Sequence, residues 1–515
     1  MEVMLSDPVI QVSGWTSDLD KVGDYTLKIR KSPAELAAER KYNSEHNIKV
    51  KIDPMNHIRK SVLTHDEQDP SVVYFLPGLW PRVKRMLDGK GLTYTVVDKR
   101  NPAIRPDLDV GALEGVELRK TQDVALALLA KADCGIIETT TAYGKSFIIS
   151  MLCKALPTLN IVVTTASSQV VSTLYEYLCK TIPGQVGVLY AGRNTVAGKR
   201  VVVTTLKSLP NIPPDNVQLV LVDECHAIGD NLAGHELMKF CWARRLGFSA
   251  SPIRNDGTAK VMESILGPTI LKMSYDEAVD AGMVTPMKYL MLPCGGCPSV
   301  AKNPDIPEYM LKRWSYWCNK SRNDVIRRFV CDLKQVYDGQ ILIMVGTLEH
   351  AIQLQMMLPW FKVAYYGASD LKDIERKFPK DRYPNFDINK IKMRSGDLDR
   401  MRNAFAKGTL RYVVATKTWK QGVNFTKLAV LIRADGDTSE VEGIQIPGRL
   451  ARLDEDKEWS YIIDVHDTFS PWALRRSQAR EKLYQKQQWK QCSYQEVLDD
   501  LSRRTKDDGQ VPSGE

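Results

Sequence analysis

Short apolar runs recur through the middle of the chain and predict the strands of parallel sheets. The first series comprises Gly135–Ile137, Ile161–Thr164, Val201–Thr204, Val217–Val222 and Arg245–Ser249. Helix-like stretches such as Ser146–Lys154 and Val170–Lys180 lie between these runs. Strands that are buried on both faces read as continuous apolar runs, and helices between them act as crossovers. The series therefore predicts one α/β domain.

A second series of the same kind follows and predicts a second α/β domain. Its runs are Ile341–Val345, Phe361–Tyr366, Arg411–Thr416, Ala429–Arg433 and Ser460–Asp464. Two successive sheets of similar layout predict two lobes with a cleft between them.

The two ends of the chain differ from this regular middle. Short apolar runs such as Val72–Phe75 and Thr93–Val97 alternate with polar stretches and predict a small α+β accessory domain. We expect domains over residues 1–110, 111–283 and 284–472, followed by a basic helix and tail over 473–515.

Composition narrows the class of protein only slightly. The 515 residues include 71 Lys and Arg against 62 Asp and Glu, and the resulting net charge of +9 permits a polyanionic partner. The N-terminus lacks the pattern of a signal peptide, and no run approaches the ~18 apolar residues of a membrane span. The ten cysteines are scattered, which favours reduced thiols. We therefore expect a cytoplasmic protein without a membrane partner.

A phosphate-binding loop is predicted where the first apolar run meets a helix. Residues 139–146 read Thr-Thr-Thr-Ala-Tyr-Gly-Lys-Ser. The backbone amides of Ala142 to Lys145 can point at phosphates, Lys145 can reach the β and γ oxygens, and the Ser146 hydroxyl can ligate Mg²⁺. The strict pattern begins with Gly, where this chain has Thr139, so a helix that Gly-Lys-Ser caps by chance is the alternative.

An acidic pair ends the apolar run Val217–Val222. Asp223 and Glu224 would lie at the carboxyl edge of the sheet, in the crevice that also holds the phosphate loop. Asp223 can hold Mg²⁺ through water, and Glu224 can polarise the attacking water. A solvated strand end is the alternative for this pair taken alone.

Arginines with the spacing of one helix face occur in the second lobe. Arg449 and Arg452 stand three residues apart, and Gln445 precedes them. Two guanidinium groups on one face suit a triphosphate, with Gln445 orienting them or the water. A basic solvated face is the alternative.

These segments, in this order and spacing, resemble the motor core of superfamily 2 helicases, above all the phage UvsW-like and XPB-like branch-migrating DNA helicases. The resemblance covers residues 112–467 and implies two tandem RecA-like domains that use ATP and Mg²⁺. Leu118–Gln122 resembles the glutamine motif, in which Gln122 would read adenine. Val163–Ala166 and Val203–Leu209 resemble motifs Ia and Ib, which touch the nucleic-acid backbone in the family.

Two further segments extend the resemblance. Gly247–Pro252 resembles motif III, which couples hydrolysis to strand binding, and is followed by Arg254–Gly257 as in the XPB-like group. Ala415–Asn424 resembles motif V. The family then implies nucleic-acid contacts by Thr165, Thr205, Lys207, Ser249, Ser251 and Thr416. It implies nucleotide contacts by Arg119, Gln122, Thr141, Ala142, Tyr143, Gly144, Lys145, Ser146, Gly422 and Asn424.

The chain departs from the family pattern in the phosphate loop and in motif V. Thr139, Thr140 and Ala142 replace the usual Gly or Ala, Pro and Gly, and Tyr143 is bulky for the turn. Asn424 stands where many members carry Asp.

Three weaker signals leave alternatives open. Cys294 and Cys297 form a lone CxxC, which we interpret as two free thiols rather than a zinc site, because zinc normally needs four ligands. The polar segment 368–395 is either a solvated insertion or a pin that meets the duplex at a fork. The basic stretches Arg82–Arg85 and Arg475–Lys490 either contact phosphates or form ordinary helix exteriors.

The sequence thus predicts an ATP-dependent DNA helicase or branch-migrating translocase. Its partners would be forked, branched or duplex DNA, which we expect the accessory domain over residues 1–110 to help bind, and proteins of replication or recombination. We expect a monomer, located in the host cytoplasm if a phage encodes it. A translocase subunit that remodels complexes without strand separation and an RNA helicase are the alternatives.

Overall fold

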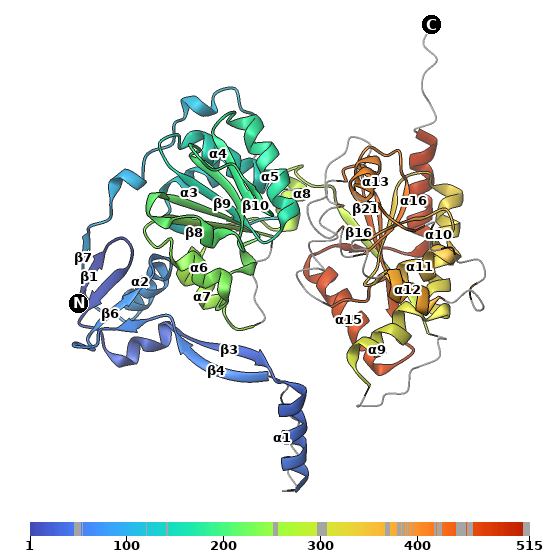
Figure 1. Ribbon diagram of the computed structural model, residues 1–515, viewed down its shortest axis with the longest axis horizontal. Coiled ribbons are helices and arrows are strands. Elements are labelled where there is room, and N and C mark those ends of the chain that lie inside the picture. Colours follow the sequence, from blue (N-terminus) through green and yellow to red (C-terminus); the bar gives the residue numbers. More distant parts are fainter. Residues whose placement is uncertain are drawn as a thin grey trace. The chain divides into compact units, whose positions relative to one another are not determined.

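The computed structural model describes residues 1–45, 53, 55–119, 121–140, 143–250, 256–295, 306–365, 371–378, 383, 387, 389, 391–394, 396–416, 419, 425–438, 450 and 457–507. The chain divides into two compact units (Figure 1). Unit 1 joins Met1–Thr139 with Gly144–Met273, and unit 2 joins Thr140–Tyr143 with Ser274–Glu515. In the described part of the chain, no helix combines the length and the apolar character that a bilayer crossing requires.

Unit 1 contains an eight-stranded sheet in the order β11-β10-β12-β9-β13-β14-β8-β15. The strands are β8 Cys134–Glu138, β9 Ile161–Thr165, β10 Val186–Tyr190, β11 Arg193–Asn194, β12 Val201–Thr205, β13 Leu219–Asp223, β14 Arg244–Ser249 and β15 Thr269–Lys272. Its helices are α3 Gln122–Lys131, α4 Lys145–Ala155, α5 Ser168–Thr181, α6 Leu232–Met238 and α7 Ala259–Leu266. All pairs are parallel except β10 with β11, so the five predicted runs are confirmed as strands of one parallel sheet.

The N-terminal segment forms a second, smaller sheet in the order β5-β6-β2-β1-β7. Its strands are β1 Glu2–Leu5, β2 Ile10–Ser13, β5 Thr64–His65, β6 Val72–Phe75 and β7 Thr95–Asp98, and α2 Trp80–Gly89 packs on it. Val3, Val12, Val73, Val83 and Leu87 are fully buried in its core. This segment is the predicted α+β accessory region.

The N-terminal sheet is joined to the larger α/β layer of the same unit chiefly through α7. Gly78 approaches α7 so closely that a Cβ there would lie 2.4 Å from the carbonyl oxygen of Glu263. The guanidinium of Arg82 makes a bidentate ion pair with the Glu263 carboxylate, at 2.6 Å for the shortest N–O distance. Arg105 joins Asp7 to Asp133. Arg82 therefore has a structural partner.

Unit 2 contains a seven-stranded parallel sheet in the order β18-β19-β17-β20-β21-β16-β22. The strands are β16 Met287–Cys294, β17 Ile341–Met344, β18 Lys362–Ala364, β19 Tyr412–Ala415, β20 Val430–Arg433, β21 Ser460–Asp467 and β22 Lys490–Gln491. The helices are α8 Tyr275–Asp280, α9 Glu308–Lys312, α10 Lys320–Val336, α11 Leu348–Met357, α12 Leu371–Lys377, α13 Asp397–Ala406, α15 Pro471–Lys486 and α16 Tyr494–Asp507, with a π-helix over Arg313–Trp317. The second series of predicted strands is confirmed.

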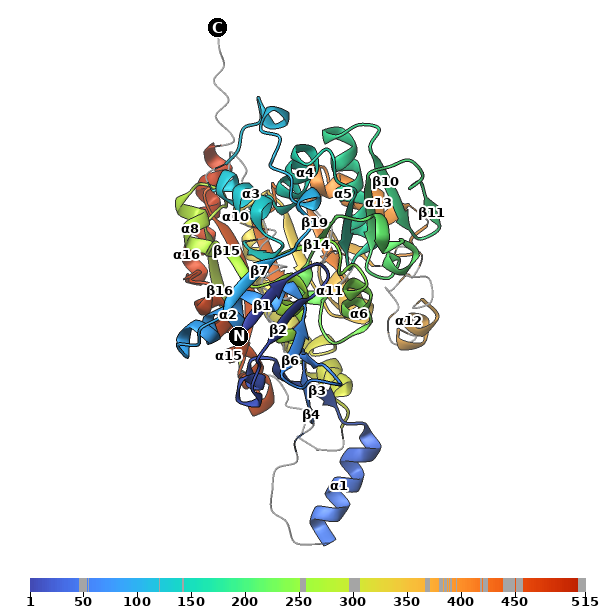
Figure 2. The same ribbon diagram turned by 90° about the vertical axis from the view of Figure 1, so that its left-hand side faces the viewer.

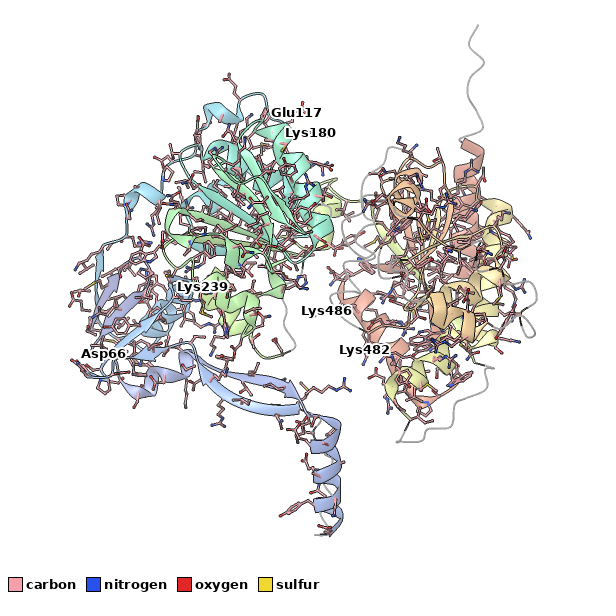
Figure 3. The ribbon with its side chains drawn as sticks, viewed as in Figure 1. Asp66, Glu117, Lys180, Lys239, Lys482 and Lys486 are labelled. Atoms are coloured by element: carbon pink, nitrogen blue, oxygen red, sulfur yellow. The ribbon has the colours of Figure 1, made fainter. Side chains whose placement is uncertain are left out.

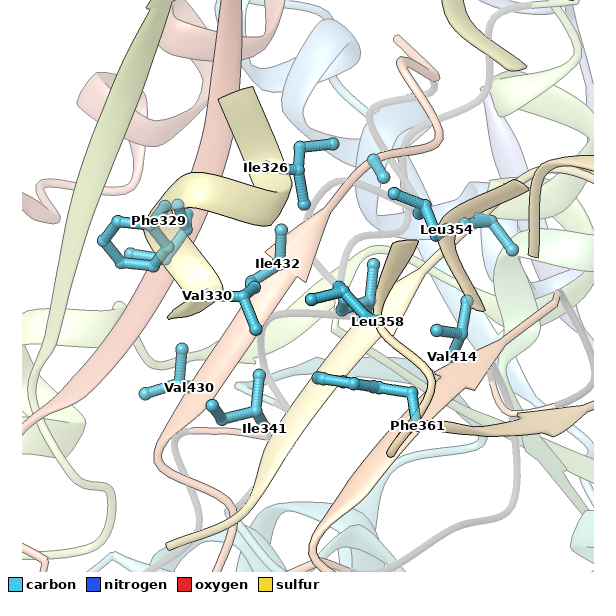
Figure 4. Packing of buried hydrophobic residues seen from close by; sticks show 14 of the residues in the cluster. Ile326, Phe329, Val330, Ile341, Leu354, Leu358, Phe361, Val414, Val430 and Ile432 are labelled. Carbon is cyan, nitrogen blue, oxygen red and sulfur yellow. The ribbon is translucent and has the colours of Figure 1, made fainter. Parts of the chain in front are cut away.

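Helices cover the unit 2 sheet with apolar side chains. Phe329 and Val330 of α10, Leu354 of α11 and Leu358 directly after it share one cluster with strand residues such as Ile341 (Figure 4). The last helix, α16, adds Val497 and Leu501 to the same core, and β22 extends the sheet. The segment that the sequence set apart as a basic helix and tail therefore supplies part of the unit 2 core.

A network of fully buried charges lies beside the carboxyl ends of β20 and β21. Arg480 Nε donates to Asp464 Oδ2 at 2.9 Å, and the Tyr484 hydroxyl donates to the same oxygen at 2.6 Å. The network consists of Arg322, Arg433 and Arg480 with Asp435, Asp464 and Asp467. Its formal charges cancel, because buried charges are tolerated only when they are paired and hydrogen-bonded.

Breaking this network should destabilise unit 2 strongly. Asp464→Asn leaves an uncompensated positive charge in the core, and we expect a loss of about 3–5 kcal/mol of unfolding free energy. Urea unfolding of the full chain measures the change. Asp499→Asn on the exposed face of α16 is the matched control and should lose less than about 0.5 kcal/mol. Equal stability of the two variants would contradict the expectation.

Candidate functional site

The chemistry-bearing residues of unit 1 lie where parallel strands end at one sheet edge. Strand β14 lies between β13 and β8, with Asp223 opposite Phe248 and Phe248 opposite Ile137. The acidic pair after β13 and the loop after β8 are therefore only one strand apart. Parallel strands make this arrangement, because their carboxyl ends and the loops that follow share one edge.

The loop between β8 and α4 has the backbone form of a phosphate cradle. Gly144 precedes α4 with φ +94°, a left-handed conformation that suits glycine. Lys145 begins the helix, is buried, and donates from Nζ to the carbonyl oxygen of Thr139 at 3.4 Å. The Thr139 amide donates to the carbonyl oxygen of Ser249 at 3.1 Å, which anchors the loop to β14. The Tyr143 side chain is fully buried.

The predicted glutamine motif lies directly against this loop. Gln122 is buried, and its Oε1 accepts from the Arg119 amide at 3.0 Å. A Cβ at Gly144 would lie 2.9 Å from Gln122 Nε2, so the side-chain amide touches the turn before α4. Arg119 itself is exposed. The structure thus places Gln122 beside the turn that precedes Lys145, and its role in nucleotide binding stays a prediction.

The acidic pair is held in a strained turn and linked to β14. Glu224 has φ +54°, which is uncommon outside glycine and recurs at functional sites. Its carboxylate lies 3.3 Å from His226 Nδ1, and the same nitrogen lies 3.3 Å from the Ser249 hydroxyl. His226 therefore bridges the end of β13 and the end of β14. The site prediction did not include this residue, although it stands only two positions after Glu224.

Burial controls the ionisation of Asp223. Burial first, and the negative charge of Glu224 second, raise the pKa of Asp223 to about 7, while the nearby ammonium of Lys145 opposes the rise. The neighbouring carboxylates of Asp223 and Glu224 thus repel each other, and the ammonium of Lys145 favours the ionised form of Asp223.

This donor set fits Mg²⁺. The cation prefers oxygen ligands and few protein carboxylates, and Asp223 and the Ser146 hydroxyl supply oxygens beside the loop. Asp223 and Ser146 would hold the ion, which would neutralise charge on the nucleotide phosphates.

The described residues that are predicted to contact nucleic acid are buried, except for Lys207. Thr165 and Thr205 pair across β9 and β12 at the same sheet edge, and both side chains are buried. Ser249 is also buried, whereas Lys207 is exposed. In unit 2, Thr416 is nearly buried and its amide donates to the carbonyl oxygen of Ala364 at 3.0 Å.

Several predicted residues lie outside the described residues. They are Thr141, Ala142, Ser251, Gly422, Asn424, Gln445, Arg449 and Arg452, and their assignments stay predictions. Cys297 and parts of the 368–395 segment lie outside as well, whereas Cys294 is buried at the end of β16. No cluster of three or more His, Cys, Asp or Glu side chains able to hold a metal occurs among the residues described.

Comparisons with known proteins agree with this geometry. Residues 115–254 match the family model of the type III restriction enzyme, res subunit, and residues 322–454 match the helicase conserved C-terminal domain. The chain belongs to the superfamily 2 helicases. The predicted fold class, α/β with two tandem RecA-like domains, is confirmed for this superfamily 2 helicase chain.

One curated relative and two solved structures illustrate the likeness. "Putative helicase 22" of Sulfolobus islandicus filamentous virus (isolate Iceland/Hveragerdi) is 22% identical over 285 residues, covering 52% of this chain and 46% of the relative. The chain thus spans about half the length of that relative. T4 UvsW matches with TM-score 0.40 and 14% identity over 95% of this chain and 98% of that chain. S. cerevisiae Dbp5 bound to RNA and ADP BeF3 matches with TM-score 0.52 and 13% identity over 81% of this chain and 99% of that chain.

The ionisation of Asp223 should appear in the pH dependence of stability. A folded-state pKa of about 7 against 3.8 in the unfolded chain gives stability that is complete below pH 3.8 and lost as pH rises through 7. Asp223→Asn removes this loss. The unfolding free energy of the variant should therefore exceed that of the wild type by up to about 4 kcal/mol at pH 8, and by less at pH 5. Thermal unfolding in EDTA without nucleotide measures the difference.

The exposed Asp107→Asn substitution is the control for that measurement and should match the wild type at both pH values. A less stable Asp223→Asn protein at pH 8 would show that Asp223 is not held unfavourably ionised.

Proposed function

We propose that this helicase-family protein hydrolyses ATP to unwind or branch-migrate forked and junction DNA. The observation that carries the proposal is the assembly of Lys145, Asp223 and Glu224 at one sheet edge, beside Gln122. Each group has a separate task there. Lys145 and the amides at the start of α4 bind phosphate oxygens, and Gln122 recognises the base.

Hydrolysis requires a positioned water and compensation of developing charge. Glu224 polarises the water, and its αL backbone and contact with His226 fix the direction of the carboxylate. Arg449 and Arg452, with Gln445, are proposed from the sequence to stabilise charge on the transferred phosphoryl group. His226 also contacts the Ser249 hydroxyl. A movement of the Glu224 carboxylate would therefore be transmitted through His226 to the end of β14.

DNA as the substrate rests on the sequence resemblance and on the basic net charge of +9. The exposed Lys207 follows β12 at the edge where Thr165 and Thr205 end their strands, and it is proposed to contact a phosphate.

A second candidate is a duplex translocase that remodels complexes without separating strands. It is favoured by one finding, the match of residues 115–254 to a restriction-enzyme subunit. Strand displacement on forked and four-way junction DNA separates the two candidates. An RNA helicase is tested in the same assay by replacing DNA with RNA.

The catalytic roles are tested by two substitutions with different expected losses. Glu224→Gln should lower ATP turnover by about 100-fold or more while leaving nucleotide binding intact, because it removes only the polarising charge. Lys145→Ala should lose nucleotide binding itself. Turnover and fluorescent-nucleotide binding are measured on the same preparations.

The exposed Glu176→Gln on α5 is the control and should retain both properties. Normal turnover in Glu224→Gln would remove Glu224 from the mechanism. The nucleic-acid class is then read from ATP turnover with single-stranded, duplex, forked and junction DNA and with RNA, and stimulation by RNA alone would contradict the DNA assignment.

A further inference from the structure

A two-stranded ribbon projects from unit 1 and belongs to neither of its larger sheets. Strand β3, Asp24–Arg30, pairs antiparallel with β4, Met55–Ser61, over seven residues each. Helix α1, Pro33–Glu45, follows β3. Figures 1 and 2 show the ribbon and α1 extending away from the rest of unit 1. An isolated two-stranded ribbon is marginal in stability, so its base must be held by other contacts.

The base of the ribbon is held by the segments that follow two strands of the ATP site. The Tyr25 hydroxyl donates to Asp230 Oδ2 at 3.0 Å, and Lys60 Nζ lies 2.6 Å from the same oxygen. Asp230 lies seven residues after Asp223, at the end of the segment that contains His226. Burial, followed by the bond to Asp230, raises the pKa of Tyr25, so the hydroxyl stays a donor.

The second anchor follows β14. The Lys28 amide donates to the carbonyl oxygen of Asp256 at 2.9 Å. Gly257, at φ +81°, approaches Thr26 so closely that a Cβ there would lie 1.9 Å from the Thr26 carbonyl oxygen. Only glycine permits this approach. Asp256 lies seven residues after Ser249, so the ribbon is tied downstream of both catalytic strands.

One face of the ribbon is basic. Residues that pair across an antiparallel ladder share a face, and Thr26 pairs with Arg59, Lys28 with His57 and Arg30 with Met55. Lys28, Arg30 and Arg59 are exposed, and their side chains form no ion pair with any described residue. By contrast, Lys31 is paired with Glu39 and Lys60 with Asp230. The three unpaired cations therefore gather on one face.

The opposite face holds the ribbon together. Leu27 pairs with Ile58, and Ile29 stands diagonally beside them. Cross-strand apolar pairs of this kind stabilise a ribbon. These apolar side chains support the ribbon by pairing across the strands, although Ile29 is 44% and Ile58 41% exposed, and the cations lie on the other face.

We propose that the basic face of the β3–β4 ribbon binds the phosphate backbone of the nucleic acid on which the motor acts. This inference rests on the proposed function. Charge complementarity selects a polyanion, and a two-stranded ribbon fits the major groove, which is about 12 Å wide. Lys28 and Arg30 stand about 6.7 Å apart along the strand, close to two nucleotide rises of 3.4 Å. The two anchors connect the bound ribbon to the segments after Asp223 and Ser249.

The test compares three full-length proteins in a salt titration of binding. One carries Lys28→Ala, Arg30→Ala and Arg59→Ala. The second keeps the positive charge at each position and changes only the side chain that carries it, as Lys28→Arg, Arg30→Lys and Arg59→Lys. The third removes equal charge elsewhere, as Lys131→Ala, Lys154→Ala and Lys180→Ala, in the last turns of α3, α4 and α5 (Lys180 is labelled in Figure 3). Fluorescence anisotropy with a labelled duplex and a labelled single strand gives the affinity at each salt concentration, without nucleotide.

The ribbon proposal expects the alanine variant alone to bind more weakly, with the slope of log K against log salt reduced by about 2–3 on duplex DNA. The second variant, which keeps the charges, should match the wild type in affinity and in salt dependence. This match would exclude a folding defect caused by substitution at these three positions. A wild-type slope in the alanine variant would overturn the proposal and leave an acidic protein as the partner of this face. ATP turnover by the wild type is measured separately. Tight binding to nucleic acid without stimulation of ATP turnover would contradict the proposed function but would leave the ribbon as a binding site.

Discussion

The burial of the Asp223 carboxylate at the end of β13, beside the loop that precedes α4, is the constraint on which the function of unit 1 depends. Asp223 is 6% exposed, and its carboxylate lies beside that of Glu224, while the charge of Lys145 only partly offsets the cost of ionising Asp223. Such a grouping opposes folding unless a cation joins it, because buried charge without a partner is costly. The parallel sheet supplies the rigid frame that tolerates this cost. Its interior strands are mostly apolar, and the two buried arginines that begin β14, Arg244 and Arg245, donate to backbone carbonyl oxygens at the other end of the sheet.

Much of the fold could be predicted from the sequence, because buried parallel strands leave a local signal. All ten apolar runs became strands, at nearly the predicted bounds. Strand β16 was missed because Lys288 and Pro293 interrupt its apolar pattern. The β3–β4 ribbon was missed for another reason. Its two strands are separated by α1 along the chain, so they do not read as a hairpin. Strand β3 does alternate Tyr25, Leu27 and Ile29 with polar residues, a signal that was overlooked, whereas β4 carries no regular alternation.

The candidate site was predictable to the extent that it is made of strand ends. Lys145, Asp223 and Gln122 each follow from local sequence, and their proximity follows from parallel topology. The bridge from Glu224 through His226 to Ser249 does not, because it depends on β13 and β14 being neighbours in space. Burial of the Thr165 and Thr205 side chains could not be foreseen either, since a residue at a strand end can be exposed or covered by the next loop.

The buried charges of unit 2 respond less to salt than the cations on its surface and on the ribbon. Arg322, Arg433 and Arg480 are shielded by protein, whereas exposed lysines are shielded by mobile ions that act over a Debye length of about 3 Å at 1 M salt. Concentrated salt therefore weakens contacts with a polyanion without reaching the interior pairs. We expect high salt to release nucleic acid bound in the proposed way while unit 2 stays folded.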